Sequence, residues 1–236
     1  MTDSFIRISV HIFILSLMSH TNFVKKRSGN SQEINLNKIK TFIKNAIITE
    51  PKCNKVDINK IISMINDSFG SKMQTSDIPT FIAEQCASMT IYHWHYGLLA
   101  GKCLMTNIHK ETENTFSEAM QKANIFLSNE FLTFTEQNKH QINNLIVHER
   151  DFQYDMFAVR TLQRSYLIKL HDKIIERPQY LIMRVAIALT LRDQIPSFEY
   201  LKNTYDAMSR QLFTHATPTL FHSGFKKQQL ASCYLM

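Results

Sequence analysis

The residues best suited to chemistry lie in the last stretch of the chain, Thr214 to Met236, which reads THATPTLFHSGFKKQQLASCYLM. Its middle, around Pro218, has the composition of a loop. Its apolar end, Leu230 to Met236, predicts a short buried strand. Ser232 and Cys233 fall within that strand, which would hold a hydroxyl and a thiol on a rigid element. A thiol in such a place is either a small core hydrophobe or a redox group.

The chain has four cysteines, and their spacing argues against a metal centre. They form no CxxC pair and have no histidine pair nearby at ligand spacing, so we expect no zinc or other metal site. Single scattered thiols are typical of a reducing compartment, which predicts a cytoplasmic location. The four are Cys53, Cys86, Cys103 and Cys233.

Composition indicates a helical protein with a sizeable core. The 236 residues are 44% hydrophobic with 16 Phe, and only 5 Gly and 5 Pro argue against a loop-rich or all-β protein. The net charge of +7 suits an anionic partner such as a nucleotide, nucleic acid or a membrane surface, although scattered basic residues more often form a solvated face. The apolar run Phe5 to Met18 is too short to span a bilayer, so residues 1–23 are an extension of unknown role and no membrane partner is expected.

A hairpin and four helices are predicted over residues 24–112, a small domain. The Ser28-Gly29-Asn30 triplet has turn chemistry between two strand-like arms. Apolar residues then recur at i, i+3 and i+4, the period of a helix with one buried face. The four helices are expected to begin near Asn37, Ile58, Asp77 and Tyr96.

The second half of the chain contains a helix that is apolar on nearly every side, Pro178 to Leu191. Such a helix is buried. Arg184 inside it must find a partner, because an unpaired buried charge is costly. Glu176 and Asp193 are the candidates. A further helix, beginning after Pro196, leads to the loop described above.

The order of residues near the carboxyl end resembles one family closely. FTHATPTLFHSG followed by QLASCYLM is similar to the class I ribonucleotide reductase large, catalytic subunit, with Thr217 and Ala231 standing where serines are usual. The runs RDF, RSYL, ERPQ and MRVA extend the resemblance upstream. It implies that residues 113–236 form the helical region of that subunit, leading into the first strand of an incomplete ten-stranded α/β barrel. The fold class is therefore mainly α.

The first half resembles the ATP-cone, the regulatory nucleotide-binding module of these reductases. VKKRSGN at 24–30, NKI at 37–39 and GLLAGKCLMTNIHKET at 97–112 carry the likeness, which implies ATP or dATP as an allosteric effector and no covalently bound cofactor. Asn37 and Pro79 replace two usual aspartates, which leaves open whether this cone binds nucleotide. The positions matching the family's nucleotide contacts are Lys26, Arg27, Gln32, Glu33, Ile34, Asn35, Leu36, Asn37, Lys38, Thr75 and Lys110.

The resemblance also implies an activity, the reduction of ribonucleoside diphosphates to deoxyribonucleoside diphosphates for DNA synthesis. Cys233 matches one of two cysteines that supply electrons, and Thr217 and Ser232 match contacts to the substrate phosphates. The implied partners are a radical-generating small subunit, a second large subunit, and thioredoxin or glutaredoxin as reductant, with no direct nucleic-acid partner. The family's radical-site residues lie beyond Met236, so we expect no turnover from this chain alone.

Two other classes of function remain open at this point. One is a truncated, non-catalytic, nucleotide-binding regulatory module. The other is a basic helical nucleic-acid-binding protein, which only the net charge suggests. Binding to DNA that weakens steeply with salt would favour the second.

Overall fold

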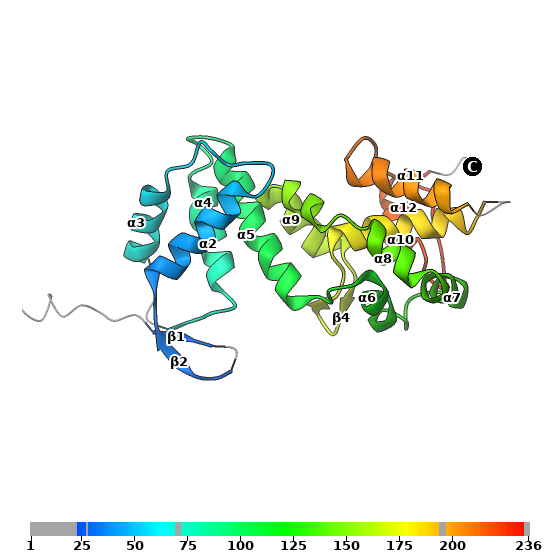
Figure 1. The fold of residues 1–236 in the computed structure, drawn as a ribbon, viewed down its shortest axis with the longest axis horizontal. Coiled ribbons are helices and arrows are strands. Elements are labelled where there is room, and N and C mark those ends of the chain that lie inside the picture. The colour runs from blue at the N-terminus through cyan, green and yellow to red at the C-terminus, as the bar shows by residue number, and fades with distance from the viewer. Residues whose placement is uncertain (1–22, 27, 69–71, 194–196, 234–236) are drawn as a thin grey trace, which may run out of the picture.

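The computed structural model describes residues 23–26, 28–68, 72–193 and 197–233. The amino-terminal extension as far as residue 22, and Arg27, lie outside this part of the chain. Over the described residues there are eleven α-helices and two small sheets, which confirms the mainly helical prediction. Figure 1 shows an elongated arrangement, with the β1–β2 hairpin near one end and the helices α11 and α12 near the other.

The amino-terminal sheet is built on the predicted hairpin. Strands β1 (Phe23–Lys25) and β2 (Ser31–Glu33) pair antiparallel. Gly29 has φ +87° in the turn, a conformation that glycine adopts without strain. A third strand, β3 (Lys72–Gln74), pairs in parallel with β1. The sequence reading missed β3, because three residues are too few for an alternating pattern to be visible.

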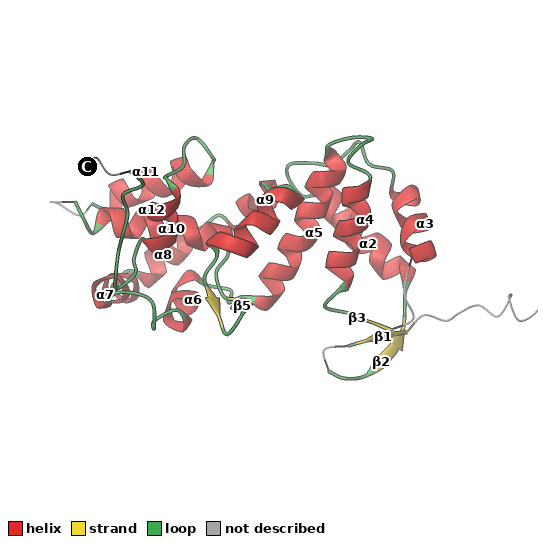
Figure 2. Cartoon of the chain, turned by 180° about the vertical axis from the view of Figure 1, so that it is seen from behind, coloured by secondary structure: helices red, strands yellow, loops and turns green. Residues whose placement is uncertain are grey.

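Four helices cover this sheet's end of the molecule, as predicted. They bury one face each around a first core that includes Ile43, Ile65, Ile82 and Leu99. Figure 2 shows them from behind, with α2, α4 and α5 side by side. Their bounds are α2 Leu36–Ile48, α3 Ile58–Ser68, α4 Ile78–Ser88 and α5 His95–Glu111.

Helix α5 also packs closely against the chain that follows. A Cβ added at Gly101 would overlap the backbone oxygen of Tyr154 and lie 2.6 Å from the carbonyl carbon of Asp155. Only glycine therefore permits this approach of a helix to a neighbouring backbone. The first core accordingly extends past residue 112 and includes Val159 and Leu181.

The rest of the chain is a set of short helices and one small hairpin. The hairpin pairs β4 (Lys169–Leu170) with β5 (Lys173–Ile174). A 3-10 helix (His148–Gln153) and a π-helical turn (Leu162–Tyr166) flank α9. The α-helices are α6 Phe116–Lys122, α7 Asn129–Gln137, α8 Lys139–Leu145, α9 Met156–Thr161, α10 Pro178–Thr190, α11 Phe198–Ser209 and α12 Thr217–His222.

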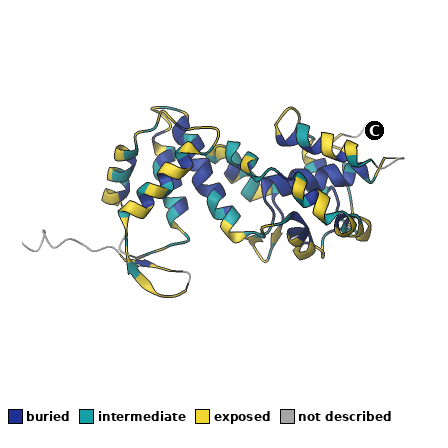
Figure 3. Ribbon diagram, in the orientation of Figure 1, coloured by how far each residue is buried: buried dark blue, intermediate teal, exposed yellow. Residues whose placement is uncertain are grey.

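Helix α10 is the centre of the second core. It is buried on nearly every side, as predicted, and Figure 3 shows it as an almost continuous dark blue ribbon. Pro178 occupies its first turn, where a missing N–H costs nothing. Around it pack α6, α7, α8 and α11, with Phe116, Phe131 and Tyr180 among the fully buried rings.

Two predictions for the carboxyl-terminal stretch need correction. The expected loop around Pro218 contains the short helix α12, and this proline was a helix-start signal rather than a loop signal. The predicted strand from Leu230 is absent as far as Cys233, and residues 234–236 lie outside the described part. A strand needs a partner to pair with its backbone. Here a side chain of α12 bonds to this backbone instead of a partner strand, since Thr219 Oγ1 donates to the Leu230 carbonyl at 3.2 Å.

Candidate functional site

Six of the predicted nucleotide contacts, residues 32–37, line one open hollow of about 380 Å³. It lies at the N-terminus of α2, where Asn35 is the cap and its Oδ1 accepts from the Lys38 amide at 3.2 Å. No acidic residue occupies the first turn. A helix N-terminus has unpaired N–H groups and a partial positive charge, both of which favour an anion. The hollow therefore combines the N–H groups at the start of α2 with one carboxylate, that of Glu33.

Lys26 and Thr75 lie together at the other end of the same sheet. Lys25 is paired with Gln74 in the parallel register, so the next residue of each strand comes side by side. The Thr75 amide donates to the Lys25 carbonyl at 2.9 Å. Lys26 is exposed and Thr75 half-buried. Lys25 pairs with Ser31, so Lys26 lies past the Ser31 end of β2, whereas the residues that line the hollow run from Gln32 away from that end.

Lys110, the remaining predicted contact, is exposed in the last turn of α5. Its Nζ lies 5.7 Å from the centre of the Phe42 ring on α2. It borders a different hollow, of about 460 Å³, with residues 172–174 of the β4–β5 hairpin. The structure therefore places Lys110 beside α2 but not in the hollow that residues 32–37 line.

The second candidate region gathers the three predicted substrate-loop residues, all exposed. Thr217 begins α12, and its Oγ1 lies 3.1 Å from the Tyr166 hydroxyl of the π-helical turn. Ser232 and Cys233 follow a segment tied to α12, where His222 Nδ1 lies 3.1 Å from the Gln229 carbonyl oxygen. The sequence reading did not find Tyr166, although a π-helical turn often marks a functional position.

Arg184 has the partner that the sequence predicted. Its guanidinium donates to both carboxylate oxygens of Glu176, at 2.7 and 3.2 Å, and both side chains are fully buried. Two further donations reach backbone oxygens, at 2.7 Å to Ser223 and 3.2 Å to Leu220. Arg184 therefore pairs its charge with a carboxylate and also donates hydrogen bonds to the carboxyl end of α12.

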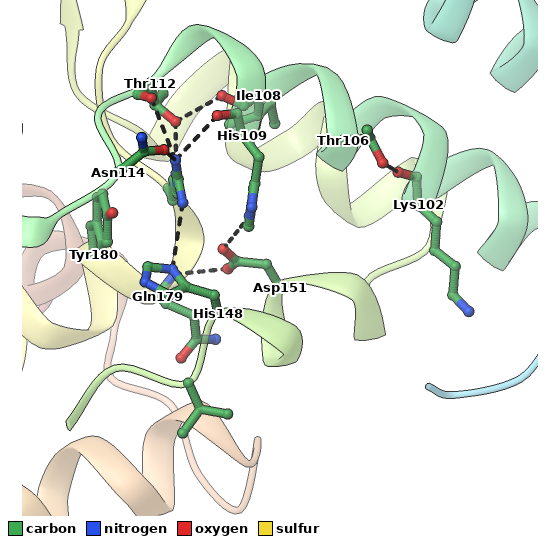
Figure 4. Close-up of polar contacts among 12 residues, drawn as sticks. Lys102, Thr106, Ile108, His109, Thr112, Asn114, His148, Asp151, Gln179 and Tyr180 are labelled. Atoms are coloured by element: carbon green, nitrogen blue, oxygen red, sulfur yellow. Dashed lines mark hydrogen bonds and ion pairs between the residues drawn. The ribbon is translucent and has the colours of Figure 1, made fainter. Parts of the chain in front are cut away.

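A second buried arginine joins the two halves of the chain near His109 and Asp151, the pair whose contact Figure 4 draws. Arg177, just before α10, donates to Thr112 Oγ1 at 2.8 Å and to the His109 carbonyl at 3.1 Å, at the end of α5. Asp151, fully buried, accepts from His109 Nε2 at 2.7 Å and from the Gln179 amide at 2.9 Å. The carboxyl end of α5 and the amino end of α10 are thus held together by hydrogen bonds.

Electrostatics inside this junction favour a neutral imidazole at His148. Burial, and then the nearby Arg177 guanidinium, lower the pKa of His148. Its Nδ1 lies 3.5 Å from the Arg177 Nη1. Sequence reasoning missed this network, because most of its partners lie on distant elements. The visible signal was two short charged runs, Glu149 to Asp151 and Glu176 to Arg177, each of which precedes an apolar segment.

The other three thiols are buried in the first core, unlike Cys233. Burial raises the pKa of Cys86 to about 12 and that of Cys103 well above its usual range. Lys102, also buried, donates through Nζ to the backbone oxygens of Ala46 and Thr49 at the end of α2, and burial lowers its pKa. Thiols that keep their protons are poor nucleophiles.

The described residues contain neither a candidate metal centre nor a membrane-spanning helix. No group of three or more His, Cys, Asp or Glu side chains among them is arranged to hold a metal ion. No helix in the described part of the chain is long and apolar enough to cross a membrane.

Comparison with known proteins gives a consistent set of relatives. The ribonucleotide reductase all-alpha domain family matches residues 152–228. The ribonucleoside-diphosphate reductase large chain 2 of Saccharomyces cerevisiae is 35% identical over 226 residues, which cover 91% of this chain and 25% of that protein. The large subunit of Vaccinia virus is 33% identical over 225 residues, covering 91% of this chain and 28% of that protein.

A vertebrate relative agrees with these. The ribonucleoside-diphosphate reductase large subunit of Danio rerio is 34% identical over 224 residues, covering 90% of this chain and 28% of that protein. The chain therefore spans about a quarter of the length of the relatives it matches. We conclude that it belongs to the ribonucleotide reductase large-subunit family and corresponds to the amino-terminal portion of that subunit.

Proposed function

We propose that this chain is the regulatory and substrate-loop part of a large subunit that reduces ribonucleoside diphosphates under ATP and dATP control. The observation that carries the proposal is an identity of 33% to 35% with relatives named for that activity, over 90% or more of the chain. The exposure of Cys233 and of Thr217, the first residue of α12, supports it.

In the proposed reaction Cys233 is one of two thiols that supply electrons. The ribose C2′–O bond breaks, the hydroxyl leaves as water, and C2′ gains a hydrogen. Two thiols become one disulfide, which thioredoxin or glutaredoxin then reduces by thiol–disulfide exchange. Thr217 and Ser232 would contact the substrate phosphates. A small subunit would generate the radical that starts the reaction, and two large subunits would form the dimer.

In the proposed regulation residues 24–112 are the ATP-cone and residues 113–236 the reductase's helical region. ATP or dATP would bind at the hollow of residues 32–37, with Lys38 in the adjoining turn of α2. Lys26, Arg27 and Thr75 would serve the hairpin end of the site. Support comes from the α2 N-terminus, which offers N–H groups and a partial positive charge to phosphates. Lys110 would add a further cation by moving away from Phe42.

Thermal unfolding with and without nucleotide tests the regulatory part. A ligand at a hundredfold excess over its Kd stabilises the folded chain by about 2.7 kcal/mol. We expect millimolar ATP or dATP to raise Tm, and Lys26→Ala or Lys110→Ala to remove most of the gain. Lys44→Ala, an exposed lysine further along α2, is the matched control. An unchanged Tm with both nucleotides would show that Asn37 and Pro79 mark a lost site.

Thiol labelling with peptide mapping tests the catalytic part. Cys233 is exposed and the other three thiols are buried, so Cys233 should react first and form no disulfide within the chain. A ribonucleoside diphosphate should slow its labelling if Thr217 and Ser232 hold the phosphates nearby. Labelling of Cys233 at the rate of Cys86 would contradict its assignment.

A non-catalytic nucleotide-binding module is the second candidate. The observation in its favour is that Leu230 to Cys233 form no strand here, so that contacts of α12 with the Gln229 and Leu230 carbonyls support the thiol in place of a sheet. The two experiments separate the candidates. ATP stabilisation without protection of Cys233 by ribonucleoside diphosphates would favour the module.

A further inference from the structure

The buried Arg184 lies beneath the segment that carries Thr217, Ser232 and Cys233. It is fully buried, yet its guanidinium reaches past Glu176 to the backbone oxygens of Leu220 and Ser223. Those oxygens lie at the end of α12, where a helix leaves its last carbonyls without partners. Arg184 therefore caps α12 from inside the core.

The turn after α12 is fixed around the same arginine. Gly224 has φ +81°, and a Cβ there would lie 3.0 Å from the Phe131 ring and 3.4 Å from Arg184 Cγ. Its backbone oxygen accepts from the Ser128 amide at 2.9 Å. The Lys226 amide donates to the Phe126 carbonyl at the same distance. The turn thus has one conformation that fits the core.

Contacts with α12 also fix the position of the segment that leads to Cys233. Thr219 Oγ1 donates to the Leu230 carbonyl, and His222 Nδ1 contacts the Gln229 carbonyl. Ser232 and Cys233 follow two and three residues after Leu230. The described residues 230–233 belong to no strand, so side-chain contacts with α12 hold this segment in place.

We propose that Arg184, together with Glu176, is a positioning pair that sets the place of α12 and hence of Thr217, Ser232 and Cys233. Arg184 acts through backbone oxygens of α12 and touches none of the three directly. The roles of those three residues rest on the proposed function, but the positioning does not. A guanidinium has five donors in a fixed fork, which neither lysine nor an apolar side chain reproduces.

A double variant separates positioning from general stability. A buried ion pair can often be replaced by uncharged side chains of similar volume at little cost in stability, whereas removing one partner strands a charge. Glu176→Gln with Arg184→Met removes both charges and keeps an acceptor for the Ile168 amide, which Glu176 Oε2 now binds at 3.1 Å. Arg184→Met alone is expected to fold poorly, so the double variant is the decisive one.

Amide hydrogen exchange measures the effect, together with the anisotropy of a fluorophore on Cys233. In the double variant we expect the Ser223 and Phe225 amides to exchange at least tenfold faster and the anisotropy to fall. The urea midpoint and the exchange of α2 to α4 should stay near wild type. Arg184→Lys should also speed the Ser223 amide, because it lacks the fork. The matched control is Arg192→Met, an exposed arginine whose Nη2 donates to Gln228 Oε1 at 2.9 Å in the same segment.

The outcomes distinguish this inference from the proposed function. Unchanged exchange at Ser223 in the double variant, or an equal rise along the whole chain, would overturn positioning by Arg184. Loss of order confined to residues 217–230 would support it. Failure of a ribonucleoside diphosphate to protect Cys233 in the wild-type chain would overturn the substrate role alone, since the exchange result does not depend on substrate.

Discussion

At the scale of single residues, two buried arginines, Arg177 just before α10 and Arg184 within it, show what a sequence can and cannot predict. Arg184 lies within an apolar helix, so its need for a carboxylate follows from the cost of burying a charge, and Glu176 was one of two candidates. Arg177 binds oxygens of His109 and Thr112, more than sixty residues earlier in the chain. No local pattern carries that information, because any residue offers a backbone oxygen.

The buried thiols make stability depend on pH in the alkaline range. Burial raises the pKa of Cys86 from 9.0 to about 12. Between these values the folded chain keeps a proton that the unfolded chain has lost, so the free energy of unfolding falls as pH rises. The contribution of the protonated Cys86 thiol to the free energy of unfolding is fully present below pH 9.0. From one thiol we expect a loss of about 1.4 kcal/mol between pH 8 and pH 10.

Urea unfolding at the two pH values measures this loss in the wild type and in Cys86→Ala. The variant loses core packing at both values, so the readout is the difference between them, which should shrink by about 1.4 kcal/mol. Cys103 adds a loss of the same sign, and Lys102, whose pKa burial lowers, opposes it. Cys233→Ala is the exposed control and should leave the difference unchanged. An equal drop in wild type and Cys86→Ala would contradict the assignment.

At the scale of elements, α5 offers a paired test of close packing. A methyl group at Gly101 would overlap the backbone at Tyr154 and Asp155, so we expect Gly101→Ala to cost about 1–3 kcal/mol. Gly97 lies one turn earlier, and its added Cβ would be 3.5 Å from Thr90 Oγ1, an ordinary contact. Gly97→Ala should instead gain up to about 1 kcal/mol of helix propensity. Urea unfolding measures whether each substitution lowers or raises the free energy of unfolding. A stabilising Gly101→Ala would show that the backbone at Tyr154 and Asp155 can move to accommodate a methyl group.

The same scale shows where sequence patterns stop being informative. The long helices were predicted from an apolar period repeated over several turns, as in α2, or from a run that is apolar on nearly every side, as in α10. The strand β3 and the helix α12 are too short to repeat anything. The strand expected from Leu230 was inferred from apolar residues alone. Whether such a run forms a strand depends on a pairing partner, which the run itself does not specify.

The features of the candidate site likewise divide into local ones and ones that depend on tertiary packing. The turn around Gly29 is a local feature that was predicted from the sequence, whereas Asn35 as the cap of α2 is a local feature that was not. The separation of Lys110 from residues 32–37 is a tertiary outcome, since it depends on how α5 crosses α2. The contact between Tyr166 and Thr217 joins residues 51 positions apart and was equally hidden.

At the scale of the whole molecule, two cores meet along α5 and α10. The first core extends to Leu181, on α10, so the two cores share one helix. Arg177 and Asp151 tie that helix to the carboxyl end of α5. Because apolar packing and buried hydrogen bonds both cross this boundary, we expect the wild-type chain to unfold in one cooperative step.

Arg177→Met tests that coupling, because it leaves several acceptors at the end of α5 without a donor. Unpaired buried groups cost about 1–3 kcal/mol each, and the loss falls at the boundary between the cores. Trp94, the chain's single tryptophan, precedes α5, and its ring contacts that of His95, so it reports on the start of α5, whereas circular dichroism reports on all helices. The two urea curves should coincide in the wild type and diverge in the variant. Arg160→Met is the control, since its exposed pair with Glu84, at 3.6 Å, also links α9 to α4 but is worth little. Coincident curves in Arg177→Met would show that apolar packing alone couples the two cores.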